Sequence, residues 1–158
     1  MAKKKVVVID DEEDFCFLLS KLLEASGRFE VFLAYDGERG KNLVFEQKPD
    51  LIFLDYVMPR MRGDEVLDIF KKDERTKHIP IIMTSGLGEA AYVAKMIQKD
   101  RGEHFDEATM GRLPLPRDLT KDETFKLNQE LRVDVFLEKP FSREKLFQAI
   151  EKTLGKVF

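Results

Sequence analysis

The residues in this sequence best suited to chemistry are five polar side chains, each of which ends or closely follows a short apolar run. They are Asp10, Asp11, Asp55, Thr84 and Lys139. Three carboxylates without sulfur or imidazole nearby are ligands that suit Mg²⁺. A carboxylate surrounded by a cation, an ammonium and a hydroxyl forms an anion site, and its natural guest is a phosphoryl group. Asp55 would then be the nucleophile that becomes an acyl phosphate.

Each of these residues also has a purely structural explanation when it is taken alone. Asp10 and Asp11 could cap a helix, and Asp55 could end a strand and start a turn. Thr84 could merely fill a strand, and Lys139 could be a solvated charge. The chemical interpretation therefore depends on whether the fold brings all five side chains to one place.

Continuous apolar runs predict five buried strands. They span residues 6–9, 29–34, 51–54, 79–83 and 133–137. Apolar residues at helical spacing predict helices between and after them. These helices span residues 13–26, 37–47, 63–72 and 142–154. Strand and helix in alternation predict an α/β fold with a doubly wound parallel sheet, in which the carboxyl ends of the strands meet at one edge.

Composition and charge narrow the class of protein. At 158 residues the chain fits one domain with a real core. A net charge of −3 gives no general electrostatic reason to bind nucleic acid or membrane. The only cysteine is Cys16, and the two histidines, His78 and His104, are too few for a histidine or cysteine metal site. We expect a soluble, cytoplasmic protein with no membrane segment and no direct contact with nucleic acid.

Four segments, in this order, make the sequence resemble the receiver domain of two-component response regulators. They are residues 8–12 (VIDDE), 49–55 (PDLIFLD) with Met58, Pro59 and Gly63 behind it, 81–85 (IIMTS) and 136–141 (FLEKPF). The resemblance implies a flavodoxin-like five-stranded sheet in the order 2-1-3-4-5. It extends over the whole chain except one segment, so we expect residues 1–158 to form a single receiver domain.

The resemblance also implies a role for each site residue. Asp55 would accept a phosphoryl group from a histidine kinase or a histidine phosphotransfer protein. Asp11 and Asp55, with the backbone carbonyl of Val57, would hold Mg²⁺, and Asp10 would act mainly through water. Lys139 would pair with the phosphoryl oxygens, and the peptide bond between Lys139 and Pro140 is expected to be cis.

A switch follows from the same resemblance. Phosphorylation adds nearly two negative charges. Thr84 would then move in to bond the phosphoryl group, and Phe136 would swing inward to fill the space that it leaves, which turns local charge into a change of surface. The alternative is that Phe136 is simply an aromatic residue of the core.

The longest departure from the family pattern lies between Ser85 and Arg132, where an ordinary receiver has one loop and one helix. Residues 89–99 predict one helix, and a capping box that starts at Thr120 predicts a second. We expect about residues 101–131 to be an insertion between the fourth and fifth strands. It could form a partner surface or a lid near the phosphorylation edge, or be a flexible decoration.

Two smaller departures concern the lifetime of the acyl phosphate. In the family, the positions two beyond the aspartate and two beyond the threonine influence how water reaches the acyl phosphate. Here they are Val57 and Gly86, and neither side chain can orient a water. We therefore expect slow self-dephosphorylation, which rapid loss of phosphate from the purified protein would contradict.

Competing functions remain open at this stage. The sequence ends soon after the last predicted helix, so we expect the output to be a contact with a downstream protein, as in stand-alone receivers, with a homodimer as a further option. An unphosphorylated receiver-like scaffold is one alternative. A phosphatase with an aspartyl nucleophile is another, although no second acid follows Asp55 at the spacing that could protonate a leaving group. We do not expect an enzyme that acts on other substrates.

Overall fold

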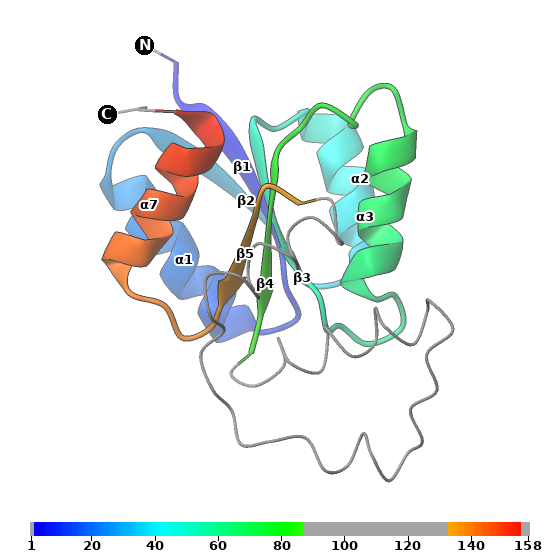
Figure 1. Ribbon diagram of the computed structural model, residues 1–158, viewed down its shortest axis with the longest axis horizontal. Helices are drawn as coiled ribbons and strands as arrows, with labels where there is room; N and C mark the ends of the chain where they lie inside the picture. The colour runs from blue at the N-terminus through cyan, green and yellow to red at the C-terminus, as the bar shows by residue number, and fades with distance from the viewer. Residues whose placement is uncertain (1, 87–132, 156–158) are drawn as a thin grey trace, which may run out of the picture.

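The computed structural model describes residues 2–86 and 133–155, and these residues form an α/β layer structure around one parallel sheet (Figure 1). The strands are β1 (Lys4–Ile9), β2 (Phe29–Ala34), β3 (Leu51–Asp55), β4 (Ile81–Ser85) and β5 (Val135–Glu138). Their order across the sheet is β2-β1-β3-β4-β5, and every neighbouring pair is parallel. The predicted flavodoxin-like sheet and its strand order are confirmed.

The last two strands begin and end later than their apolar runs predict. Ile79 belongs to a turn, because its N–H donates to the carbonyl of Thr76 (2.9 Å). Pro80 follows, and β4 therefore starts at Ile81 and continues through Ser85. The β5 strand likewise starts at Val135 rather than at residue 133. Consequently Thr84 lies within a strand, where the sequence placed it just beyond one.

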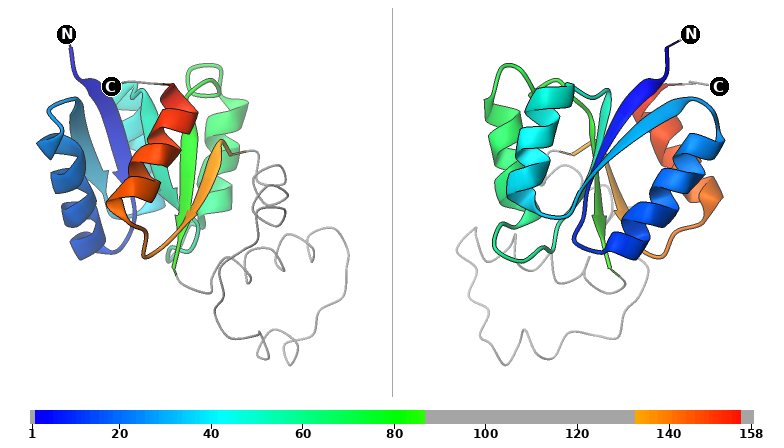
Figure 2. Two further views of the ribbon diagram at one scale, coloured as in Figure 1. Left: turned by 60° about the vertical axis from the view of Figure 1, so that its left-hand side comes forward. Right: turned by 180° about the vertical axis from the view of Figure 1, so that it is seen from behind.

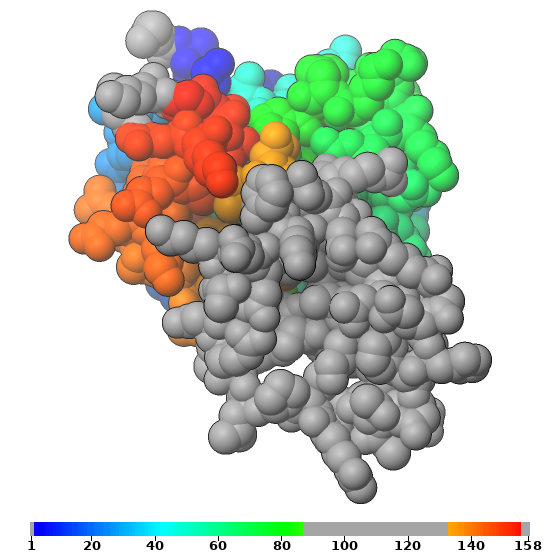
Figure 3. All heavy atoms as spheres, in the orientation of Figure 1, coloured from blue at the N-terminus to red at the C-terminus, as the bar shows by residue number. Residues whose placement is uncertain are grey.

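Two pairs of helices cover the two faces of the sheet. On one face lie α1 (Glu13–Ala25) and α7 (Arg143–Leu154), and on the other lie α2 (Gly37–Gln47) and α3 (Gly63–Lys72). Figures 1 and 2 show this division, and in Figure 3 the atoms of α7 (orange to red) and α3 (green) form opposite flanks of the molecule. Each face has its own buried core because the sheet separates them.

The helix boundaries largely match their sequence signals. The helix predicted over residues 142–154 is α7, and Ser142 caps it, because its hydroxyl accepts from the Lys145 N–H (3.1 Å). In contrast, Leu18 and Leu22, two apolar residues whose spacing helps to predict α1, are 62% and 38% exposed. The apolar arc of α1 is wider than the face that packs on the sheet, so part of it stays at the surface. No described helix is long and apolar enough to cross a membrane.

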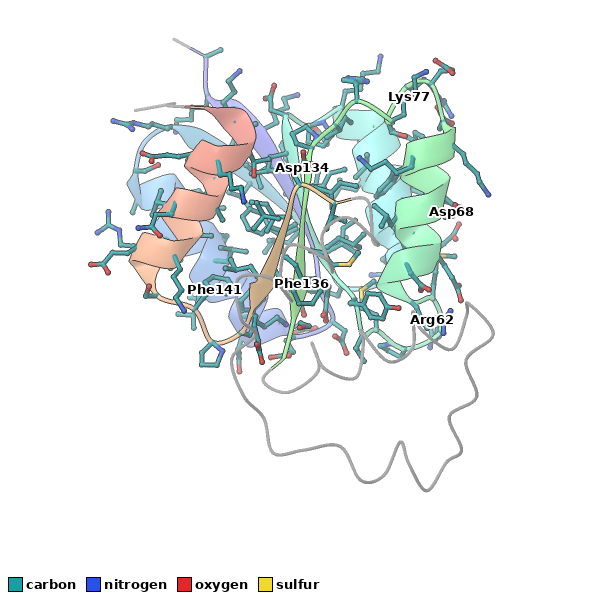
Figure 4. The ribbon with its side chains drawn as sticks, viewed as in Figure 1. Arg62, Asp68, Lys77, Asp134, Phe136 and Phe141 are labelled. Carbon is teal, nitrogen blue, oxygen red and sulfur yellow. The ribbon has the colours of Figure 1, made fainter. Side chains whose placement is uncertain are left out.

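The start of β5 is fixed by Asp134, whose position at the amino end of the strand is labelled in Figure 4. Its carboxylate accepts from the Ile81 N–H (2.9 Å), and its own N–H donates to the Ile81 carbonyl (3.1 Å). These reciprocal bonds set the register of the edge strand beside β4. The predicted helices over residues 89–99 and after Thr120 lie outside the described residues, as does the predicted insertion.

Candidate functional site

The sheet brings the predicted chemical residues to the carboxyl edge of its central strands. Asp55 and Thr84 are neighbours across the β3–β4 pair, at the last and second-to-last positions of their strands. Side chains alternate along a strand, so Asp55 shares a face with Phe53 and Thr84 shares a face with Ile82. Both of those residues belong to the core beneath α1 and α7. The carboxylate and the hydroxyl are therefore directed to the same side of the sheet.

Lys139 joins this edge from β5 and is almost fully buried, with its side chain 9% exposed. Its Nζ atom lies 2.7 Å from Asp10 Oδ2 and 3.9 Å from Asp55 Oδ2. A third acid, Glu12, is 3.3 Å away through Oε1 and is itself exposed. The ammonium thus sits among three carboxylates, two of which are buried.

Burial and charge act against one another in this cluster. Desolvation raises the pKa of Asp10 above its ordinary value of 3.8, and it exceeds the opposing influence of the Lys139 ammonium 2.7 Å away. For Lys139, burial alone would lower the pKa, but the close contact with Asp10 and the charge of Asp55 together raise it above 10.5. Lys139 is therefore held as an ammonium at neutral pH.

Three carboxylates at this edge lie close enough to hold a metal ion. One oxygen from each of Asp10, Asp11 and Asp55 can be chosen so that all three lie within 4.8 Å of one another. Asp10 and Asp55 are buried, whereas Asp11 is exposed. All three donors are hard oxygens, which is the donor type that Mg²⁺ takes, and a divalent cation would relieve the repulsion between them. The residues present therefore fit the predicted Mg²⁺.

The loop after β3 is shaped around Asp55. The Val57 N–H lies 3.4 Å from Asp55 Oδ1, which is at the long limit of a hydrogen bond, and Val57 is 40% exposed. Further along the loop, the Gly63 N–H donates to the Tyr56 carbonyl (2.8 Å). A Cβ atom at Gly63 would collide with the backbone carbonyl of Asp55 and with the Cα of Tyr56. Only glycine allows the start of α3 to approach the phosphoacceptor candidate so closely.

On the other side of the site, the chain leaves β5 through a cis peptide bond between Lys139 and Pro140, as predicted. The Lys139 N–H donates to the Ser85 carbonyl (2.6 Å), which continues the sheet ladder to the lysine itself. The backbone of Lys139 is therefore fixed to β4, next to Thr84.

Thr84 and Phe136 occupy different faces of the sheet. Thr84 is 1% exposed and lies beside Asp55, whereas Phe136 is 5% exposed and packs in the core beneath α2 and α3. Figure 4 shows Phe136 at β5. This inward position agrees both with the predicted switch and with the alternative of a core aromatic, so the role of Phe136 as a switch stays a prediction.

Two residues near the site were not assigned a role from the sequence. Glu12 contacts Lys139, and the ring of Phe15 lies against the same ammonium, 4.3 Å from ring centroid to Nζ. Glu12 follows the acidic pair directly, so its position offered a signal. Phe15 offered none, because its ring reaches the lysine only through the placement of α1 over the sheet.

Known sequences and structures resemble this chain over most of its length. The sequence profile described as "Response regulator receiver domain" matches residues 6–104. A relative from Synechocystis sp., named DNA-binding dual master transcriptional regulator RpaA, is 33% identical over 115 residues, which are 73% of this chain and 44% of that protein. The phosphate regulon transcriptional regulatory protein PhoB of Pseudomonas aeruginosa is 35% identical over 89 residues, 56% of this chain and 38% of the relative. The matches thus span less than half the length of these curated relatives.

Solved structures support the fold. The Vibrio cholerae chemotaxis protein CheY4 superposes with a TM-score of 0.68 at 20% identity, over 96% of this chain and 99% of that one. A response regulator receiver domain protein from Clostridium thermocellum gives a TM-score of 0.63 at 23% identity, over 94% and 91% of the two chains. At these identities the likeness concerns the arrangement of the sheet and helices.

Proposed function

Because this chain belongs to the response regulator receiver domain family of two-component systems, we propose that Asp55 is its phosphoacceptor. The observation that carries this proposal is the convergence of the Lys139 ammonium on the two buried carboxylates of Asp10 and Asp55. Response regulators work with histidine kinases, and we propose that the donor here is such a kinase or a histidine phosphotransfer protein.

In the proposed reaction, one carboxylate oxygen of Asp55 attacks the phosphorus of a phosphohistidine on the donor. The bond between phosphorus and the imidazole nitrogen breaks, the nitrogen keeps the electron pair, and an acyl phosphate forms on Asp55. Lys139 would stabilise the charge on the phosphoryl oxygens through its fixed ammonium. The lysine is already within 3.9 Å of the carboxylate, so little rearrangement is needed.

We propose that Asp11, Asp55 and the backbone carbonyl of Val57 hold Mg²⁺, with Asp10 acting mainly through water. When bound, the ion would neutralise negative charge on the oxygens of the phosphoryl group that is transferred from the donor to Asp55. The support is the cluster of Asp10, Asp11 and Asp55 oxygens. Its acidic residues lie on the loop after β1 and at the end of β3, so the ion would join the two central strands.

The consequence of phosphorylation would be a switch built from Thr84 and Phe136. Thr84 is buried beside Asp55, close enough in the sheet for its hydroxyl to turn toward a phosphoryl group. Met83, which precedes Thr84, is the register neighbour of Phe136 on β5. A shift of β4 would therefore reach Phe136 through direct strand contact.

We propose the domain organisation and the output of this chain on the same footing. We propose that residues 1–158 act as one receiver domain with an insertion at about residues 101–131, and that its output is contact with a downstream protein. The relative RpaA is named as DNA-binding, so the expectation of no direct contact with nucleic acid remains a prediction for this chain. Members of this family generally serve in signalling. We likewise predict that this chain is not an enzyme on other substrates, that it is cytoplasmic and that it can form a homodimer.

The test is the intact mass of the protein after incubation with acetyl phosphate and Mg²⁺. We expect the gain of one phosphoryl group, which is lost in the Asp55→Asn variant and without metal. Asp73→Asn is the control, because it changes a half-buried aspartate just after α3 that is not part of the carboxylate cluster. No gain under any condition would favour the unphosphorylated scaffold, and a gain that persists in Asp55→Asn would assign the phosphoacceptor elsewhere.

A further inference from the structure

Phe15, on the first turn of α1, is part of the immediate surroundings of Lys139. The Lys139 Nζ atom lies 4.3 Å from the centroid of the Phe15 ring, within the range of a cation–π contact. The same ring meets Phe141 edge to face, with centroids 5.7 Å apart and planes at 87°. Phe141 comes two residues after Lys139, so Lys139, the cis-proline Pro140 and Phe141 belong to one short segment.

We propose that Phe15 is a positioning residue for Lys139. Its ring would hold the Lys139 ammonium in place for the phosphoryl group. This inference rests on the function proposed above and deepens it. Phe15 would touch no reacting atom; it would act through the lysine, and Phe141 would act through Phe15 by fixing the angle of the ring.

A lysine needs such help because its side chain is long and flexible. Its ammonium is drawn toward water, and holding it in one geometry costs rotamer entropy. Asp10 and Glu12 attract it from one side, at 2.7 Å and 3.3 Å. Neither carboxylate would keep it near Asp55 once a phosphoryl group competes for it. The ring supplies a third attractive surface, which does not compete as an acceptor for the hydrogen bonds that the phosphoryl oxygens need.

Phe15 packs against the edge of the core beneath α1 and α7, but its surroundings give it more than a packing role. Phe15 is only half-buried, and it borders a cavity of about 480 Å³ that Lys139, Pro140 and Phe141 also line. A ring placed there shields the lysine from the solvent side and leaves space beyond it. A purely apolar residue such as leucine would still cover the edge of the core, but it would not attract the ammonium.

The same helix offers a matched comparison. The ring of Phe17 lies 5.3 Å from Lys21 Nζ, also as a cation–π contact, but Phe17 is 57% exposed. Phe17→Leu therefore removes a ring from α1 and a lysine contact, and it leaves Lys139 untouched. It is the control for every measurement below.

The first measurement tests the contact in the unphosphorylated protein, where the proposed function is not needed. A ring current shifts nearby protons upfield, so the ε-methylene protons of Lys139 should show an upfield NMR shift. We expect this shift to persist in Phe15→Tyr and Phe17→Leu and to vanish in Phe15→Leu. A Lys139 signal that is the same in all four proteins would overturn the proposed contact.

The second measurement tests the consequence, with beryllium fluoride and Mg²⁺ as the mimic of the phosphoryl group. Phe15→Leu should weaken its binding by about tenfold, the factor expected for a partly desolvated cation–π contact. Phe15→Tyr, which keeps the ring, and Phe17→Leu should stay within about twofold of the unchanged protein. Thermal unfolding of each variant shows that the fold is retained.

The outcomes separate the inference from the function beneath it. If the unchanged protein does not bind beryllium fluoride, the proposed phosphoacceptor function fails. If it binds and Phe15→Leu binds equally well, or if Phe15→Tyr loses as much affinity as Phe15→Leu, the function stands and the positioning role of the ring is wrong.

Discussion

Two aspartates of this molecule pair with a cation at nearly the same distance, and yet their pKa values shift in opposite directions. Asp10 Oδ2 lies 2.7 Å from Lys139 at the edge of the sheet, and Asp73 Oδ2 lies 2.8 Å from Arg75 just after α3. The pKa of Asp10 is raised, first by burial, whereas the hydrogen bonds from Arg75 lower the pKa of Asp73 to about 2.

The difference shows that the direction of the pKa shift of a paired aspartate depends more on its burial than on its distance from the cation. The Asp73 side chain is 27% exposed and keeps part of its contact with water, so the hydrogen bonds from Arg75 outweigh the effect of burial and stabilise the charged form. Asp10 has lost that water, and one ammonium shared with Asp55 and Glu12 does not compensate for it. The site thus has unmet demand for positive charge, which a metal ion could supply.

The largest expected effect comes from removing the buried ammonium. Lys139→Met keeps most of the side-chain stem but leaves Asp10 and Asp55 without their cation. The metal-free free energy of unfolding should fall by about 3 kcal/mol, the cost of an uncompensated buried charge. Urea denaturation in the presence of a chelator measures this value.

Arg75→Met is the control, since it removes the cation of the more exposed pair. It should shift the thermal midpoint by less than about 2 °C. If Lys139→Met shifts the thermal midpoint as little as the control does, Asp10 is effectively hydrated and the proposed difference between the two ion pairs is wrong.

The next effect is the response of stability to Mg²⁺. An ion that binds only the folded protein should stabilise it by about 2.7 kcal/mol at a hundred times its dissociation constant. Asp55→Asn should lose most of this gain, because one charged ligand is removed, and Asp73→Asn should keep it. Thermal unfolding across a Mg²⁺ titration measures this gain in stability. An equal gain in both variants would place the ion outside the carboxylate cluster.

The pKa directions make a third test, by carboxyl NMR titration of the metal-free protein. Asp73 should remain charged down to about pH 2, and Asp10 should take up its proton above pH 3.8. Because the folded protein lowers the pKa of Asp73, this aspartate should stabilise the fold at pH values above its unfolded-state pKa, and the contribution should be lost as the pH falls toward 2. Because the folded protein raises the pKa of Asp10, the contribution of this aspartate to stability should be present at low pH and lost as the pH rises. A pKa of Asp10 below 3.8 would contradict the dominance of burial.

The smallest effect is expected at a second exposed pair with the same short distance. Lys72 Nζ lies 2.7 Å from Asp68 Oδ2 on α3, with the two side chains 75% and 44% exposed. Lys72→Ala should change the free energy of unfolding by no more than about 0.5 kcal/mol. A loss comparable to that of Lys139→Met would show that distance alone sets the strength of these pairs.

Much of the site could be predicted because it depends on strand periodicity and chain order. Continuous apolar runs identified buried parallel strands, and parallel strands have their carboxyl ends at one edge, so Asp55, Thr84 and Lys139 had to converge. The resemblance to receiver domains implied the cis bond before Pro140, and apolar residues at helical spacing predicted the helix that follows it.

The rest depends on three-dimensional packing that no local pattern encodes. The contact between Phe15 and Lys139 joins residues far apart in the chain, and it needs both the placement of α1 and the path after β5. The exposure of Leu18 depends on how wide a face α1 turns to the sheet. The start of β4 moved because a turn bond at Ile79 competes with the sheet for the same backbone.

The reciprocal bonds between Asp134 and Ile81 have a consequence for how this chain can vary. They fasten the amino end of β5 to β4, and the bond from the Lys139 N–H to Ser85 fastens its carboxyl end. The connection from residue 86 to 134 thus leaves and rejoins the sheet at anchored points. The entropy of closing such a connection grows only with the logarithm of its length, by about 0.6 kcal/mol for each doubling. A connection of another length could therefore join the same two anchored points at little cost in chain entropy, and the carboxyl edge beside it would keep its register.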